Sequence, residues 1–110
     1  MMAFDEGLAQ RIREVLAGST PVLEKKMFGG LAFMVAGHMC VGVTGEELMA
    51  RVGPDRYLEA LARPGAREMD FTGKALKGFV YVAAEEIEEE HDLESWVAMA
   101  LDFVRTLPPK

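Results

Sequence analysis

The sequence contains very little cysteine, with Cys40 the only one in 110 residues. A single cysteine excludes a disulfide within the chain. The stretch His38-Met39-Cys40-Val41 has the apolar character of a strand that buries a small thiol. We therefore interpret Cys40 as a structural residue rather than a reactive one.

Long hydrophobic runs are also absent, since none approaches the ~20 apolar residues that cross a bilayer. The first residues, Met1-Met2-Ala3-Phe4-Asp5-Glu6, have neither the basic nor the long apolar segment of a secretory signal. We expect a cytoplasmic protein that does not bind membranes. The chain is half hydrophobic, and its length fits a single globular domain over residues 1–110.

The chain lacks a surplus of basic residues, because its net charge is -6. Direct binding of nucleic acid needs a concentrated cationic surface, so it is not expected here. Residues 51–77 are nevertheless locally basic, with six basic and four acidic side chains. The opposite pole is the run 85–90, whose carboxylates are expected to precede or open the last helix and to meet the positive end of its dipole.

The hydrophobic pattern predicts helices at both ends of the chain and strands between them. Leu8, Ile12 and Leu16 recur at helical spacing behind Asp5, a good N-cap, and Gly37-His38 reads as a tight hairpin turn. The final apolar stripe, from Leu93 to Val104 behind Asp92, either covers a sheet or forms a dimer seam. The expected elements are a helix at 5–17, strands at 22–28, 31–36, 39–43 and 47–52, a short helix at 54–63, strands at 68–71 and 79–83, and the final helix.

Groups that carry catalysis are sparse. His38 and His91 lie far apart, with no second histidine or cysteine at metal-ligand spacing, so we predict no metal site and no cofactor. Nucleophilic catalysis by Cys40 would require His91 to fold against it, which the sequence does not indicate. His38 is interpreted as a solvated turn residue. The expectation is therefore a protein that is not an enzyme and has no catalytic residues.

The pair Gly29-Gly30 separates two apolar, strand-like segments. Adjacent glycines permit a positive φ or the close approach of another backbone. The run Met27-Phe28-Gly29-Gly30 is followed by a strand pattern, so it lacks the helix N-terminus that a phosphate or dinucleotide loop uses. We interpret the pair as a strand junction and as a signature of the fold.

Several motifs occur in one order along nearly the whole chain. They are the segments 27–35 (Met-Phe-Gly-Gly-Leu-Ala-Phe-Met-Val), 47–54 (Glu-Leu-Met-Ala-Arg-Val-Gly-Pro), 63–67 (Arg-Pro-Gly-Ala-Arg), 69–73 (Met-Asp-Phe-Thr-Gly) and 77–82 (Lys-Gly-Phe-Val-Tyr-Val). This series resembles the N-terminal domain of the TfoX/Sxy family. The chain looks like a stand-alone copy of that domain, without the further C-terminal helical domain of the longer members linked to natural competence.

The resemblance implies an α+β fold similar to secretion chaperones, in which N- and C-terminal helices cover an antiparallel sheet and a short helix lies between strands 4 and 5. Folds of this kind often form homodimers, so the resemblance favours a regulatory or protein-interaction module with a protein partner. The family carries no agreed set of catalytic residues. The structural glycines of the matching motifs are Gly29, Gly30 and Gly73.

The alternative function is binding of a small anionic ligand at the strand-to-helix junction from Arg51 to Arg56. A helix N-terminus offers free N–H groups, and arginine can hold a carboxylate or phosphate with two parallel hydrogen bonds. Pro54 removes one such donor, and Asp55 could occupy the position itself, so a plain helix cap is the competing interpretation. The candidate ligand-binding residues are Arg51, Gly53, Arg56, Arg67 and Lys74.

Overall fold

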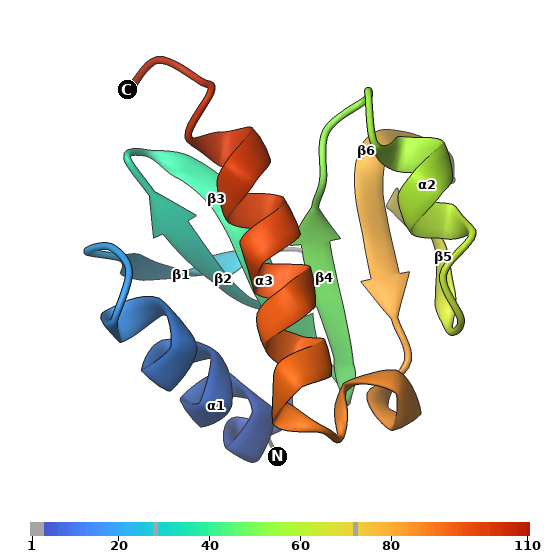
Figure 1. The fold of residues 1–110 in the computed structure, drawn as a ribbon, viewed down its shortest axis with the longest axis horizontal. Helices are drawn as coiled ribbons and strands as arrows, with labels where there is room; N and C mark the ends of the chain where they lie inside the picture. Colours follow the sequence, from blue (N-terminus) through green and yellow to red (C-terminus); the bar gives the residue numbers. More distant parts are fainter. Residues whose placement is uncertain (1–3, 28, 72) are drawn as a thin grey trace.

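The computed structural model, which describes residues 4–27, 29–71 and 73–110, shows an antiparallel six-stranded sheet with the strand order β1-β2-β3-β4-β6-β5 (Figure 1). The predicted α+β fold is confirmed, including the meander of the first four strands. In chain order the elements are α1 (Glu6–Ala17), β1 (Leu23–Met27), β2 (Gly30–Val35), β3 (His38–Thr44), β4 (Glu47–Arg51), α2 (Tyr57–Leu61), β5 (Ala66–Phe71), β6 (Lys74–Val82), the 3-10 helix η1 (Ala84–Ile87) and α3 (Glu90–Val104).

Helices α1 and α3 lie side by side on one face of the sheet (Figure 1). Asp5 caps α1 as predicted, because its side chain accepts a hydrogen bond from the Leu8 amide at 3.1 Å. The apolar stripe of α3, including Trp96, is buried against strands β3 and β4. Of the two roles left open for this stripe, covering the sheet is therefore the one that the fold uses.

The elements differ from the sequence prediction mainly around β6 and the two later helices. Strand β6 begins at Lys74 rather than residue 79, because residues 74–75 continue the β5–β6 hairpin by pairing with residues 70–71. Helix α2 begins only at Tyr57, three residues later than predicted. Helix α3 begins at Glu90 with Glu89 at its N-cap, so the predicted cap at Asp92 is wrong. The acidic run does precede and open this helix, as expected.

The glycine pair has two separate structural roles. Gly29 adopts a φ of +75° in the turn between β1 and β2, a conformation that favours glycine. Gly30 begins β2, and a Cβ atom placed there would collide with the Val43 carbonyl of β3. Gly73 likewise has a φ of +82°, between β5 and β6. The interpretation of the pair as a strand junction is confirmed, while its neighbour Phe28, like Thr72, lies outside the described residues.

The prediction of His38 as a solvated turn residue is wrong. The turn between β2 and β3 consists of Ala36 and Gly37, and His38 is the first residue of β3 with only 8% of its surface exposed. Its Nε2 atom donates a hydrogen bond of 2.7 Å to the Pro108 carbonyl. The residues after α3 return to this hairpin, where the Lys110 amide donates to the Ala36 carbonyl at 3.0 Å. Contacts this distant in sequence bury the histidine.

The two faces of the sheet carry different cores. The main core contains side chains of α1, α2, α3 and the sheet face toward them. A second, smaller cluster consists of strand residues alone, with Ala32, Met39, Met49 and Met69 buried at its centre and Met27, Met34, Leu76, Phe79 and Tyr81 half-buried around them. We call this second cluster the methionine face.

Among the described residues, none of the helices has the length and apolar character that crossing a bilayer would require.

Candidate functional site

Arg51, at the end of β4, lies between two aromatic rings. Its guanidinium carbon is 5.2 Å from the centre of the Phe79 ring on β6 and 5.5 Å from the centre of the Phe103 ring on α3. Phe79 belongs to the methionine face and Phe103 packs against the main core, so Arg51 sits where the two faces meet at the end of the sheet. Burial lowers the pKa of Arg51. No carboxylate of the described residues pairs with it.

Gly53 lies two residues after Arg51 and adopts a φ of +84°. A Cβ atom at this position would run into the Phe103 ring, so glycine lets the chain pass close to α3. Gly53 is thus a packing residue, because it makes room for the Phe103 ring that Arg51 contacts. Its geometry does not present an N–H array to a ligand.

Arg56 is occupied by carboxylates of its own chain. Its Nη2 atom donates to Glu59 at 2.9 Å, and its Nη1 atom lies 3.9 Å from Asp102 of α3. The hydrogen bond to Glu59 raises the pKa of Arg56. Helix α2 begins one residue later and is five residues long, with no side-chain cap. The predicted junction therefore offers no extended helix N-terminus at Arg51 to Arg56.

Arg67 of β5 lies on the methionine face, because it pairs with Tyr81 of β6. Its Nη2 atom donates to Glu47 at 2.9 Å, and its guanidinium stacks 4.6 Å from the centre of the Tyr81 ring. The side chain of Lys74 lies outside the described part of the chain. The structure thus brings Arg51, Arg56 and Arg67 to different carboxylates and rings, and they do not converge on one anion.

The methionine face carries cations that the sequence prediction did not single out. Lys25 of β1 pairs with Ala32, and Leu23 pairs with Met34, so both side chains lie on this face at its edge. Leu23 is 77% exposed. The signal in the sequence was the two-residue alternation that puts Leu23, Lys25 and Met27 on one side of β1. The polar run Glu24-Lys25-Lys26 obscures this alternation, because it predicts a strand that is partly exposed or at an edge.

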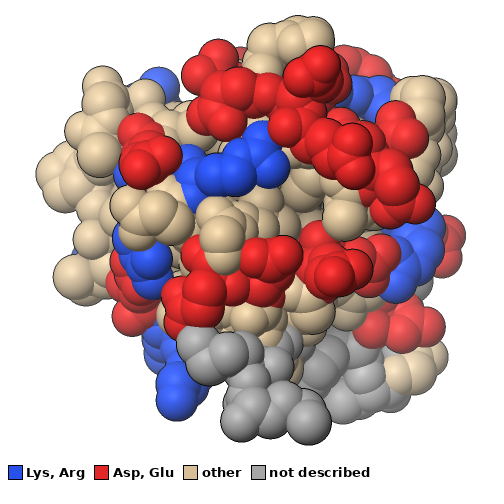
Figure 2. Space-filling view, turned by 90° about the horizontal axis from the view of Figure 1, so that it is seen from below, with Lys and Arg blue, Asp and Glu red and all other residues tan. Residues whose placement is uncertain are grey.

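A strongly acidic surface occupies the end of the molecule where η1, the start of α3 and the β3–β4 turn meet (Figure 2). It includes an open pocket of about 320 Å³, whose lining combines Leu8 and Ile87 with Asp5, Arg11, Glu46 and Glu88. The described residues contain no group of three or more histidine, cysteine or acidic side chains placed to hold a metal ion.

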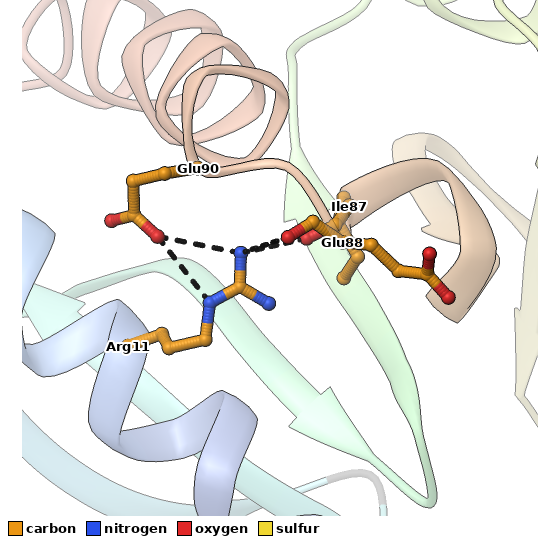
Figure 3. A network of polar contacts seen from close by, with 4 residues as sticks. All are labelled: Arg11, Ile87, Glu88 and Glu90. Carbon is orange, nitrogen blue, oxygen red and sulfur yellow. Dashed lines mark hydrogen bonds and ion pairs between the residues drawn. The ribbon is translucent and has the colours of Figure 1, made fainter.

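Arg11 of α1 connects this helix to η1 and to the start of α3 at the acidic end (Figure 3). Its Nη2 atom donates to the Ile87 carbonyl at 2.8 Å and to the Glu88 carbonyl at 3.2 Å, and its guanidinium reaches Glu90 at 3.4 Å. These carbonyls end η1, just before α3 begins. Arg11 therefore holds the junction of η1 and α3 against α1, and its Nε and Nη2 donors are used within the chain.

Cys40 is fully buried in the main core, as predicted for a structural residue. Burial raises the pKa of its thiol to about 12, and the charges of Arg105 and Arg51 oppose this shift only in part. A thiol in this state carries almost no thiolate near neutral pH. His91 is exposed and lies 3.2 Å from Asp92, its neighbour in α3.

These features define a class of small α+β domain, in which helices cover one face of an antiparallel sheet and the other face bears methionine and aromatic side chains. The family model described as the TfoX N-terminal domain matches residues 14–104. The chain therefore belongs to the TfoX N-terminal domain family, as its motifs indicated. Comparison with curated proteins and with solved structures finds no match.

Proposed function

We propose that the chain is a non-enzymatic regulatory or protein-interaction module that acts in the cytoplasm. The observation that supports this function is the methionine face, which consists of strand residues alone and has half-buried apolar side chains at its margin. Apolar surface gathered on one face is a common feature of protein-binding sites. Membership of the TfoX N-terminal domain family is compatible with a regulatory role.

Affinity capture tests this proposal. The tagged chain is incubated with an extract of its own cells, retained proteins are identified by mass spectrometry, and each candidate is purified and titrated against the purified chain by calorimetry. We expect at least one candidate to bind directly with a Kd below about 10 μM. A chain that binds none of the retained proteins once they are purified would contradict the proposal.

Homodimerisation is a separate part of the proposal. The apolar stripe of α3 is buried within the chain, so a dimer would have to use another surface, such as the free edge of β1. Size-exclusion chromatography with light scattering measures the mass directly. A mass that remains that of one 12.1 kDa chain at millimolar concentration would rule out the dimer.

Binding of a small anion is the alternative function, and the position of Arg51 is what favours it. This guanidinium is held between two rings and has no carboxylate partner among the described residues. A thermal-shift screen with phosphorylated metabolites at millimolar concentration tests it, because ligand at about 100 times its Kd adds about 2.7 kcal/mol to the free energy of unfolding. No shift with the wild type, or the same shift with Arg51→Gln, would refute this alternative.

A further inference from the structure

The methionine face is buried at its centre and partly exposed at its margin. Ala32, Met49 and Met69 are fully buried, and all members of this cluster among the described residues belong to strands. Around them, half-buried Met34 and Tyr81 leave part of their apolar surface in contact with solvent. Leu23, on the same face beside Met34, is 77% exposed. A partner laid across this surface would therefore bury apolar area without any opening of the core.

The chemistry of these side chains suits an adaptable docking surface. Five of the eight methionines of the chain, Met27, Met34, Met39, Met49 and Met69, belong to this one face. Methionine is unbranched and polarizable, so a surface built from it can adjust to the shape of a bound segment. Phe79 and Tyr81 add rigid aromatic area of the kind that anchors interfaces.

The margin of the methionine face is positively charged, in contrast to the chain as a whole. Lys25 and Arg51 stand at it without a carboxylate partner among the described residues, and Arg67 is neutralised by Glu47. A large group of the acidic residues lies at the end formed by η1 and the start of α3 (Figure 2), and Glu47 beside the methionine face is paired with Arg67. Charge complementarity at this margin therefore selects for carboxylates.

We propose that the methionine face binds an acidic amphipathic segment of another protein, whose apolar side chains cover Met34 and Tyr81 and whose carboxylates meet Lys25 and Arg51. This inference rests on the proposed function and names the surface and the partner chemistry. A second copy of the chain fits the surface less well. A two-fold contact through this face would place Lys25 and Arg51 of both copies in one interface and would supply no unpaired carboxylate from the methionine face to neutralise them.

The test uses a display library of random linear peptides selected against the full chain. The enriched peptides are synthesised and titrated into protein carrying ¹³C-labelled methionine methyl groups. We expect the selected peptides to combine apolar and acidic residues and to shift the signals of Met34 and Met27. Met99, in α3 within the main core, serves as the internal reference and should stay in place.

Neighbouring lysines provide a matched pair of variants. Lys25→Glu should weaken peptide binding about tenfold, because a favourable charge at the margin becomes a repulsive one. Lys26→Glu should change it by less than about twofold, since Lys26 pairs with Leu31 and points to the opposite face. Met34→Gln removes apolar character at similar size and should also weaken binding, with its folding verified by thermal unfolding.

The failure of this inference is distinguishable from the failure of the proposed function. Peptides that shift Met99 instead, or that bind Lys25→Glu and Met34→Gln as tightly as wild type, would overturn the methionine face as the site while leaving an interaction module in place. Enrichment of basic peptides, self-association through this face, or no enrichment at all would also overturn the inference. The proposed function would then be decided by whether the proteins found by affinity capture bind the chain after purification.

Discussion

The two faces of the sheet differ in how deeply neighbouring residues of the same strands are buried. On the face toward α1 and α3, side chains such as Phe33 and Leu48 are fully buried beneath helices. On the methionine face, Met34 and Tyr81 are only half-buried and are surrounded by strand residues. The first face supplies most of the hydrophobic burial that stabilises the fold, and the second leaves part of its apolar area exposed to solvent.

Arginines on both faces contact other groups of the chain, either a carboxylate or an aromatic ring. Those near the helices are used within the chain: Arg13 pairs with Glu24, and Arg63 stacks 3.9 Å from the centre of the Trp96 ring. Arg51 and Lys25, at the margin of the methionine face, have no carboxylate partner among the described residues. Paired and unpaired cations therefore occur on both faces, since Arg67 of the methionine face pairs with Glu47 and Arg63 has no carboxylate partner among the described residues.

The largest expected difference between the faces is in thiol reactivity. Cys40, in the main core, should react with a thiol reagent at pH 8 at least about 1,000-fold more slowly in the folded chain than in denaturant, because burial both shields it and raises its pKa to about 12. A cysteine placed on the other face, Met34→Cys with Cys40→Ser, should react quickly. Equal rates at the two positions, measured by absorbance, would remove the distinction between a closed and an open face.

Truncation of adjacent residues on β2 compares the two faces directly. Phe33→Ala should lower the free energy of unfolding by about 3–5 kcal/mol, because it leaves a cavity under the helices. Met34→Ala should lower it by only about 1 kcal/mol, since its side chain already contacts solvent. Denaturant unfolding measures both values. A loss at Met34 as large as that at Phe33 would mean that the methionine face is a second full core.

Arg11 tests whether the helix layer depends on its fixed charges. Arg11→Met removes the donors to the Ile87 and Glu88 carbonyls and should lower the free energy of unfolding by about 1–2 kcal/mol. Glu90→Gln is the control, since its contact with Arg11 is 3.4 Å long and should be worth less than about 0.5 kcal/mol. If both variants unfold at the wild-type denaturant concentration, Arg11 does not support the junction of η1 and α3.

The smallest effect is expected from the ion pair between α1 and β1. The hydrogen bond from Arg13 lowers the pKa of Glu24 in the folded chain, so its stabilisation is complete above the unfolded pKa and is lost as the pH falls through the folded pKa. Glu24→Gln should lower the free energy of unfolding by less than about 1 kcal/mol at pH 6. This difference should shrink toward pH 3 and be absent in Arg13→Gln. A difference independent of pH would exclude the ion pair as its cause.

Local patterns predicted most of the fold correctly. The spacing of Leu8, Ile12 and Leu16 behind Asp5 identified α1, and tight turns between short apolar runs identified the meander. The start of β6 at Lys74 was missed because Lys74 and Lys77 with two glycines look like a loop. They form a strand because β5 supplies the pairing partner.

The candidate site was less predictable, since charge in the sequence does not say which partner a side chain reaches. Arg56 and Arg67 are basic residues of the central segment, but each pairs with a carboxylate. Glu47 is twenty residues from Arg67 in the chain, and only the fold brings the two together. Lys25 lies in the polar run Glu24-Lys25-Lys26. The sequence therefore does not show that it stands beside an apolar face without a carboxylate partner among the described residues.

The class of fold, the family and the glycine junction follow from the sequence, because periodicity, capping and backbone freedom are properties of neighbouring residues. Gly29 and Gly30 show this most clearly, since their spacing between two apolar runs already indicated where one strand turns into the next. Which sheet face the helices cover, which arginines are neutralised and why His38 is buried became clear from the folded chain. Those outcomes depend on contacts between residues far apart in the chain, whose distances no local pattern encodes.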